Sequence, residues 1–183
     1  MKFRIVLFCL INVLSSHSII NFGQDPICEH MTDSSGKSKG IKLTLSFPCD
    51  WKEMDSNSPD EVFKFAKKDK EVKVLTSAIL NISDIPAGLS SSQQKELLAP
   101  EGLKTLSEGS GEIESNKPLR INNVMGGQII RKDADRNYYK IRNYFIYKNK
   151  LISISYFLLS ASPVNVKDYF DAFDSLLNKT KFN

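Results

Sequence analysis

The sequence predicts an α+β fold in which helices cover an antiparallel β-sheet and an amphipathic helix closes the chain. Three observations predict it. Strand-like runs occur in both halves of the 183-residue chain, helical signals occur between them, and the last segment carries one apolar stripe at helical spacing. Helices set between runs of consecutive strands are typical of α+β proteins.

The first half opens with a strand at 41–47, in which apolar and polar residues alternate without a fault. This alternation predicts one dry face, made of Ile41, Leu43, Leu45 and Phe47. Pro48 lacks an N–H group and ends the strand. A short strand is expected at 62–65, and the β-branched run 72–82 predicts a more deeply buried strand.

The middle of the chain predicts two short helices. Ser90 and Gln93 have the spacing of a capping box, which predicts a helix over 91–99. A second helix is expected over 101–106, and the sequence SEGSG at 107–111 ends it. Because this section is the least hydrophobic helical part, we expect it to be peripheral and mobile.

The second half predicts four more strands, at 112–121, 127–131, 138–147 and 151–159. The turn Lys148-Asn149-Lys150 predicts a tight hairpin between the last two, with Asn149 available for a left-handed conformation. Gly126 and Gly127 are expected to form a bend at a strand start. They do not read as a phosphate loop, because such a loop feeds directly into a helix.

The chain ends in a predicted helix with Ser162 as its N-cap and Pro163 as its first residue. A single apolar stripe runs along this helix, which we expect to lie on the sheet. The stripe consists of Val166, Tyr169, Phe170, Phe173, Leu176 and Leu177.

The first 23 residues have the pattern of a secretory signal peptide. Two basic residues, Lys2 and Arg4, precede an apolar run of about ten residues, and a membrane span needs about twenty. Cleavage fits after Ser18 or after Gly23. We favour the second site because the junction NFGQ resembles the signal-peptide ends of exported Bacteroidetes proteins. The protein is therefore expected to be exported, either periplasmic or secreted, with no membrane span after cleavage.

Cys9 lies inside the apolar run. A lipidated cysteine follows a small residue, but bulky Phe8 precedes Cys9. Cys9 is therefore interpreted as an apolar residue of the signal peptide and not as a lipid anchor.

Cleavage after Gly23 leaves 160 residues, enough for one domain, and a formal charge of +2. The remaining charges are interspersed, as in RKDADR at 131–136. Nucleic-acid binding needs a coherent basic face. The sequence predicts no such face, and we expect no nucleic-acid partner.

Two cysteines follow the expected cleavage site, Cys28 and Cys49. Export would place them where disulfides persist, and one pair has only one connectivity. We expect a bond that staples the polar N-terminal arm, 24–40, to the first strand. Two free thiols are the alternative.

From residue 41 to 183, the chain resembles the PsbP-like fold. The resemblance rests on FPCDW at 47–51, a long hairpin at 138–159 and a closing helix that ends near FDSLLNKTKFN. A photosystem accessory protein, a small eukaryotic Ran-binding protein and many exported bacterial proteins of unknown role share this fold. The resemblance implies a single αβα sandwich domain over 41–183, in which Trp51 covers the end of the sheet.

The sequence predicts no catalytic constellation. His30 lies in the polar arm, whereas a catalytic histidine needs a rigid position. Asp133 and Asp135 could do acid–base work, but Arg131 and Arg136 flank them in an expected hairpin loop. Too few suitable ligands occur together for zinc or calcium. We expect no enzymatic activity, no metal and no cofactor.

A non-enzymatic binding or accessory module of the cell envelope, with an envelope protein as its partner, is the favoured function. The partner surface is predicted on the tyrosine-rich hairpin, where alternation turns some rings outward. Its residues are Tyr138, Tyr139, Tyr144 and Tyr147. The alternatives are a small-ligand-binding protein with 90–111 as its lid and a hydrolase built from dispersed carboxylates.

Overall fold

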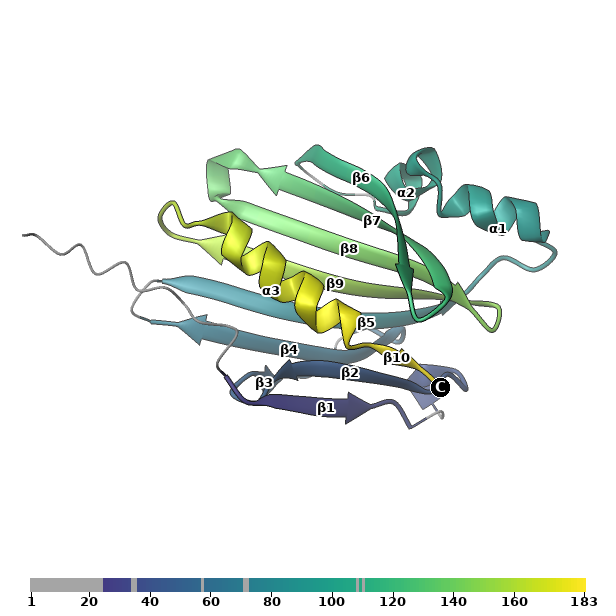
Figure 1. Cartoon of the computed structure of the whole chain (residues 1–183), viewed down its shortest axis with the longest axis horizontal. Helices are drawn as coiled ribbons and strands as arrows, with labels where there is room; N and C mark the ends of the chain where they lie inside the picture. The colour runs from purple at the N-terminus through teal and green to yellow at the C-terminus, as the bar shows by residue number, and fades with distance from the viewer. Residues whose placement is uncertain (1–24, 34–35, 57, 71–72, 108, 110) are drawn as a thin grey trace, which may run out of the picture.

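Seven antiparallel strands form the larger of two sheets, in the order β3-β4-β5-β9-β8-β7-β6 (Figure 1). The strands are β3 (Lys52–Glu53), β4 (Glu61–Asp69), β5 (Val74–Asp84), β6 (Glu112–Ile121), β7 (Val124–Asp133), β8 (Tyr138–Tyr147) and β9 (Lys150–Ser160). The computed structural model describes residues 25–33, 36–56, 58–70, 73–107, 109 and 111–183. The expected signal peptide, 1–23, lies outside these described residues.

A smaller sheet takes its strands from both ends of the chain. It contains β1 (Ile27–Met31), β2 (Leu43–Pro48) and β10 (Lys181–Phe182), with β2 in the middle and antiparallel to both neighbours. The predicted dry face is confirmed, since Ile41, Leu43, Leu45 and Phe47 are each at most 2% exposed.

The N-terminal arm is not the loose polar segment that its composition predicts. Residues 27–31 form an edge strand whose register runs from Ile27 opposite Pro48 to Met31 opposite Thr44. The backbone of β2 supplies the partners that these residues lack among themselves, which is why a segment without a strand pattern becomes a strand.

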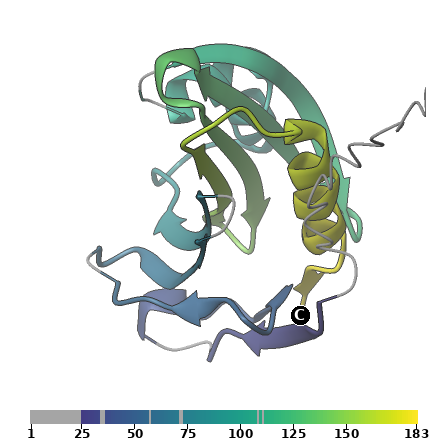
Figure 2. The ribbon, with the colours of Figure 1, turned by 90° about the vertical axis from the view of Figure 1, so that its left-hand side faces the viewer.

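One face of the large sheet, which we call the inner face, packs against α3 (Val166–Asn178) and the small sheet together. Tyr156 of β9 stacks on Phe173 of α3 with 4.9 Å between ring centroids. The predicted helical stripe is confirmed, because Tyr169, Phe173, Leu176 and Leu177 are all buried. Figure 2 shows the chain passing from α3 directly into the small sheet.

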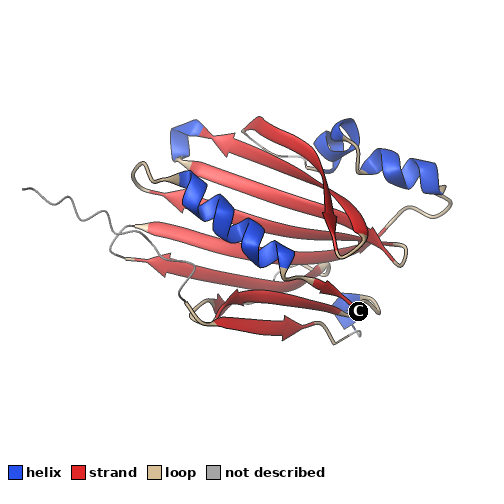
Figure 3. Ribbon diagram, viewed as in Figure 1, coloured by secondary structure: helices blue, strands red, loops and turns tan. Residues whose placement is uncertain are grey.

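The opposite face, which we call the outer face, is only partly covered. Two short helices, α1 (Ser91–Leu97) and α2 (Pro100–Leu106), lie beside one end of the sheet (Figure 1). Leu103 of α2 packs with Ile129 and Tyr144, whereas α1 has no buried residue. The α+β class is confirmed. The sequence predicted that helices alone cover the large sheet, and this is not confirmed. On the inner face the small sheet packs beside α3, and strands make up most of the molecule (Figure 3).

The helix boundaries follow the predicted signals in the middle of the chain but not at its end. Ser90 and Gln93 form the expected capping box. The closing helix begins after Asn165 and not at Ser162. The reason is that Ser162 is held in a turn at the end of β9, where its N–H donates to Ser160 Oγ at 3.3 Å.

Gly126 and Gly127 lie inside β7 and do not form the bend expected before a strand. A Cβ atom on Gly127 would come within 2.5 Å of Leu103 Cδ1 and 2.8 Å of the Leu98 carbonyl oxygen. A Cβ atom on Gly126 would lie 2.4 Å from the Tyr144 carbonyl oxygen. Glycine is therefore required here because α2 and β8 approach the backbone of β7 closely.

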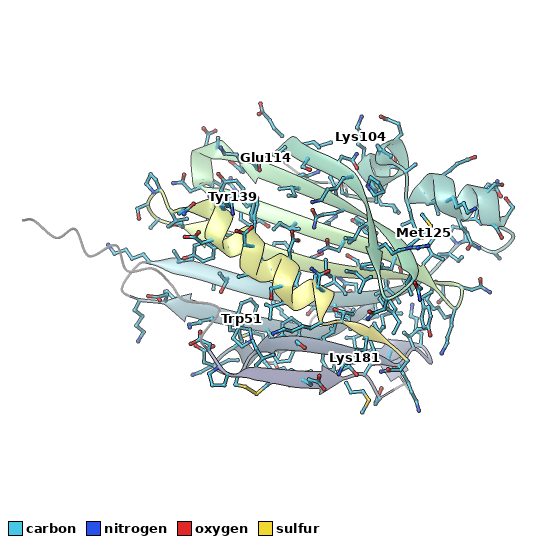
Figure 4. All side chains as sticks on the ribbon, viewed as in Figure 1. Trp51, Lys104, Glu114, Met125, Tyr139 and Lys181 are labelled. Atoms are coloured by element: carbon cyan, nitrogen blue, oxygen red, sulfur yellow. A yellow bond between two sulfur atoms is a disulfide. The ribbon has the colours of Figure 1, made fainter. Side chains whose placement is uncertain are left out.

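A disulfide joins Cys28 and Cys49, with 4.9 Å between their Cα atoms. The Cys49 N–H also donates to the Pro26 carbonyl at 2.8 Å. Trp51 follows directly, is 5% exposed and stacks on Phe47 (Figure 4). The bond and the buried ring together fix β1 and β2 at one end of the small sheet, as the sequence predicted.

Within the described ranges, no helix is both long and apolar enough to cross a lipid bilayer.

The double variant Cys28→Ser/Cys49→Ser is expected to lose about 3 kcal/mol of unfolding free energy, because the bond closes a loop of about twenty residues. Urea unfolding of the variant and of the oxidised protein measures the loss. The oxidised protein with added reductant should match the variant. Equal stability of all three samples would contradict the prediction.

Gly127→Ala is expected to destabilise the fold by about 1–3 kcal/mol, because the new methyl group overlaps Leu103 and the backbone of α2. Met125→Ala is the matched control on the same strand. Met125 is 52% exposed, so its truncation should cost less than about 0.5 kcal/mol. Urea unfolding of both variants checks the difference, and similar losses would refute the close packing of α2.

Candidate binding face of the large sheet

Strand register arranges the outer-face residues in rows that cross the large sheet. Residues directly opposite each other on neighbouring strands share one face. The first row contains Lys68, Leu75, Leu159, Tyr138 and Asp133. The second row contains Ala66, Ser77, Phe157, Lys140 and Arg131, and the third contains Lys64, Ile79, Ser155, Arg142 and Ile129.

The first row carries an exposed apolar edge. Leu75 and Leu159 are directly opposed and are 38% and 41% exposed. Beside them, Tyr138 stacks on Phe157 at 6.2 Å between ring centroids. Exposed apolar neighbours of this kind are typical of surfaces that another molecule covers.

A cleft of about 870 Å³ opens at the same edge. Leu75 and Leu159 contribute apolar surface to it, and basic side chains surround that surface. Among the described residues, the charged side chains lining the cleft are Lys68, Lys70, Lys73, Arg136 and Asp69.

The second and third rows bring three more cations together. Lys140 lies directly opposite Arg131, and Arg142 is two residues along the same strand. The Lys140 ammonium lies over the Phe157 ring, 5.4 Å from its centroid. Burial, with the nearby Arg142 and Arg131 charges, lowers the pKa of Lys140 to about 8.

Within the described residues, no carboxylate forms an ion pair with these three cations. Arg142 Nη1 donates to the Tyr144 hydroxyl at 3.2 Å. Arg131 donates to Ser107 Oγ at 3.2 Å and to the Gly111 carbonyl at 3.0 Å. Neutral oxygens therefore orient both guanidinium groups and leave their charges uncompensated.

The four tyrosines of the predicted partner surface divide between the two faces. Tyr139 packs edge-on to Phe170 of α3 at 5.7 Å, at one end of that helix (Figure 4). Tyr147 likewise packs on Phe182, so both lie on the inner face. Tyr144 is on the outer face but is 4% exposed, and its hydroxyl donates to the Leu106 carbonyl of α2 at 2.9 Å.

Tyr138 is therefore the one member of the predicted set that is partly exposed on the outer face. Alternation along β8 places Lys140 and Arg142 on the same side as Tyr138 and Tyr144. In YYKIRNY, at 138–144, two positive charges occupy alternate positions, and this pattern could have predicted a basic outer face. The prediction based on tyrosines alone did not include these cations.

Of the residues considered for catalysis, Asp133 lies on the outer face opposite Tyr138, whereas His30 lies on the small sheet. His30 is on β1, with its ring 4.4 Å from the Phe65 ring between centroids, so it belongs to an aromatic cluster and not to a loose arm. Asp133 and Asp135 lie at the predicted turn between β7 and β8, where Asp133 pairs with Arg136 at 3.7 Å. Among the described residues, no three His, Cys, Asp or Glu side chains are grouped so as to hold a metal ion.

Comparison with known proteins identifies the fold. No protein-family model and no curated protein sequence matches the chain. The solution structure of cyanobacterial PsbP (CyanoP) from Synechocystis sp. PCC 6803 superimposes with a TM-score of 0.57 at 12% identity, covering 86% of this chain and 92% of that chain. The Saccharomyces cerevisiae Ran-binding protein Mog1p matches with a TM-score of 0.52 at 7% identity, covering 86% of this chain and 96% of that chain.

The chain has a PsbP-like fold. The resemblance inferred from FPCDW, the long hairpin and the closing helix is thereby confirmed. At these identities the likeness shows the fold alone. The shared fold therefore does not specify which outer-face residues bind a partner.

The lowered pKa of Lys140 predicts a specific pH dependence of stability. The native state releases the Lys140 proton near pH 8, whereas the unfolded chain holds it to about pH 10.5. Because the unfolded state binds more protons between these values, native stability should rise there with pH. Lys140→Met should lack this rise. Urea unfolding of both proteins from pH 7 to 10.5 tests the prediction, which fails if their difference in unfolding free energy is independent of pH.

Proposed function

We propose that the chain is an exported, non-enzymatic binding or accessory module of the cell envelope, and that an envelope protein covers its outer face. The exposed pair Leu75–Leu159 carries this proposal. The solvated face of an antiparallel sheet normally presents polar residues, whereas this pair continues into Tyr138 and Phe157. A protein partner would remove these side chains from water.

Two observations support export. The first 23 residues have the charge order and apolar length of a signal peptide. The Cys28–Cys49 bond would persist in an oxidising compartment such as the periplasm or the cell exterior.

The fold is compatible with a binding role. One solved structure that shares it, Mog1p, is described as a Ran-binding protein. That description supports the use of PsbP-like domains as binding modules, although it specifies no partner for this chain.

Small-ligand binding beneath a lid at 90–111 is the second candidate. The helices of that segment do cover part of the outer face, where Leu103 is fully buried against Gly127. The large cleft, however, lies by Tyr138, about 20 Å along β8 from Tyr144, which α2 covers. The cleft and the helices are therefore separate features, which favours a protein partner.

The proposal predicts that partner capture depends on the apolar edge. Mild crosslinking of the tagged full-length protein in its own host should recover one envelope protein in stoichiometric amount. Leu75→Asp/Leu159→Asp should lose this protein, because buried carboxylates would oppose apolar contact. Met31→Asp is the control, since Met31 is 64% exposed on the small sheet.

Capture should be unchanged in the Met31→Asp control, and far-ultraviolet circular dichroism should show that all variants are folded. Capture by the double variant at the wild-type level would refute the outer face as the interface. Recovery of the wild-type protein alone would refute the accessory role, and native mass spectrometry would then test for a bound small molecule.

A further inference from the structure

Three cations of the outer face, Arg131, Lys140 and Arg142, which we call the cation row, form no ion pair with a carboxylate among the described residues. Arg131 and Lys140 are directly opposed on β7 and β8. Like charges in this position destabilise a sheet. The ring of Phe157 offsets part of the cost for Lys140, because a cation over an aromatic face is attracted to it by about 0.5–1 kcal/mol.

One nearby acid, Asp133, is engaged elsewhere. Asp133 is two residues from Arg131 on the same strand, yet its carboxylate pairs with Arg136. The burial of Lys140 and the repulsion from two guanidinium groups both oppose its charge. An anion bound here would relieve that repulsion, so the cation row is complementary to a negatively charged group of another molecule.

The spacing of the row favours a particular kind of anion. Lys140 and Arg142 are two residues apart on a strand, which separates them by about 7 Å. Alternate side chains of another extended chain have the same spacing. Carboxylates at alternate positions of such a chain could therefore each meet one cation.

We propose that Arg131, Lys140 and Arg142 bind an extended acidic segment of the partner protein, with carboxylates at alternate residues. This inference rests on the proposed function and specifies the chemistry of its partner. Arginine has five N–H donors in a fixed fork, which suits carboxylate oxygens. Arg142 uses one donor group internally and Arg131 two, so donors remain on both.

The neighbouring rows fit the same occupant. Ser77 is partly exposed opposite Phe157 in the second row and can donate a hydrogen bond to a polar backbone. Phe157 and Leu159 continue the face toward the apolar edge. An acidic segment with an apolar residue at one end would therefore match both the charge and the exposed hydrophobic surface.

The test uses three fluorescein-labelled octapeptides and fluorescence anisotropy at low salt. One alternates glutamate with threonine, one replaces each glutamate by glutamine, and one has the first composition with four consecutive glutamates. The alternating peptide should bind most tightly. Lys140→Gln/Arg142→Gln should weaken this binding about tenfold, the effect of about 1.4 kcal/mol.

The control variant Lys42→Gln/Lys117→Gln removes the same charge from exposed residues outside these rows, one just before β2 and one on β6. It should change the affinity by less than about twofold, because exposed charges at a distance are screened. Equal weakening in both variants would overturn the proposal, as would equal binding of the glutamine or block peptide. Displacement by inorganic phosphate at the same charge concentration would show a simple anion site and would also overturn it.

Failure of this test would leave the proposed function intact. Capture of the envelope protein depends in that experiment on Leu75 and Leu159, and neither peptide variant changes them. Loss of capture in the apolar variant together with no peptide binding would keep the interface but reject the acidic segment.

Discussion

The cover of the inner face is the constraint on which the rest of the structure depends. Seven strands span about 30 Å, and one helix covers about 10 Å. The 13-residue helix α3 therefore cannot bury this face alone. The dry face of β2 supplies the remaining apolar surface, so the small sheet is part of the core and not an appendage. The disulfide joins β1 to the end of β2, and Trp51 packs into the core that the two sheets share.

The longest helix, α3, and the apolar face of β2 therefore both pack on the inner face. The outer face retains only α2, which sits closely on β7 because Gly127 has no side chain. Beyond α2, partly exposed leucines and aromatic rings alternate with Arg131, Lys140 and Arg142, which form no ion pair within the described part of the chain. The fold therefore separates a side that provides stability from a side on which side chains can vary with little effect on the core. Binding specificity is most easily carried on the second side.

Local pattern predicted much of this architecture. The alternation at 41–47, the capping box at Ser90 and the stripe of α3 all describe contacts within a few residues, and all were found. The strand β1 was missed because its partner, and not its own sequence, makes it a strand. The cation row was missed because Arg131 and Lys140 are nine residues apart in an interspersed stretch and meet only through register. Alternation along β8 indicated that the tyrosines point to both faces of the sheet. It could not show which face α3 covers, and so could not show which tyrosines are buried.

The small sheet also determines when the fold can be completed. β2 pairs with β1 from the start of the domain and with β10 from its last residues, and Asn183 bonds to Thr44 Oγ1 across 139 positions. Contacts so distant in sequence form late and slowly. One edge of β2 stays unpaired until residues 181 and 182 are free to reach it. The core can therefore close only after the whole stretch from β1 to β10 is available, which makes the emergence of β10 a timing signal for folding.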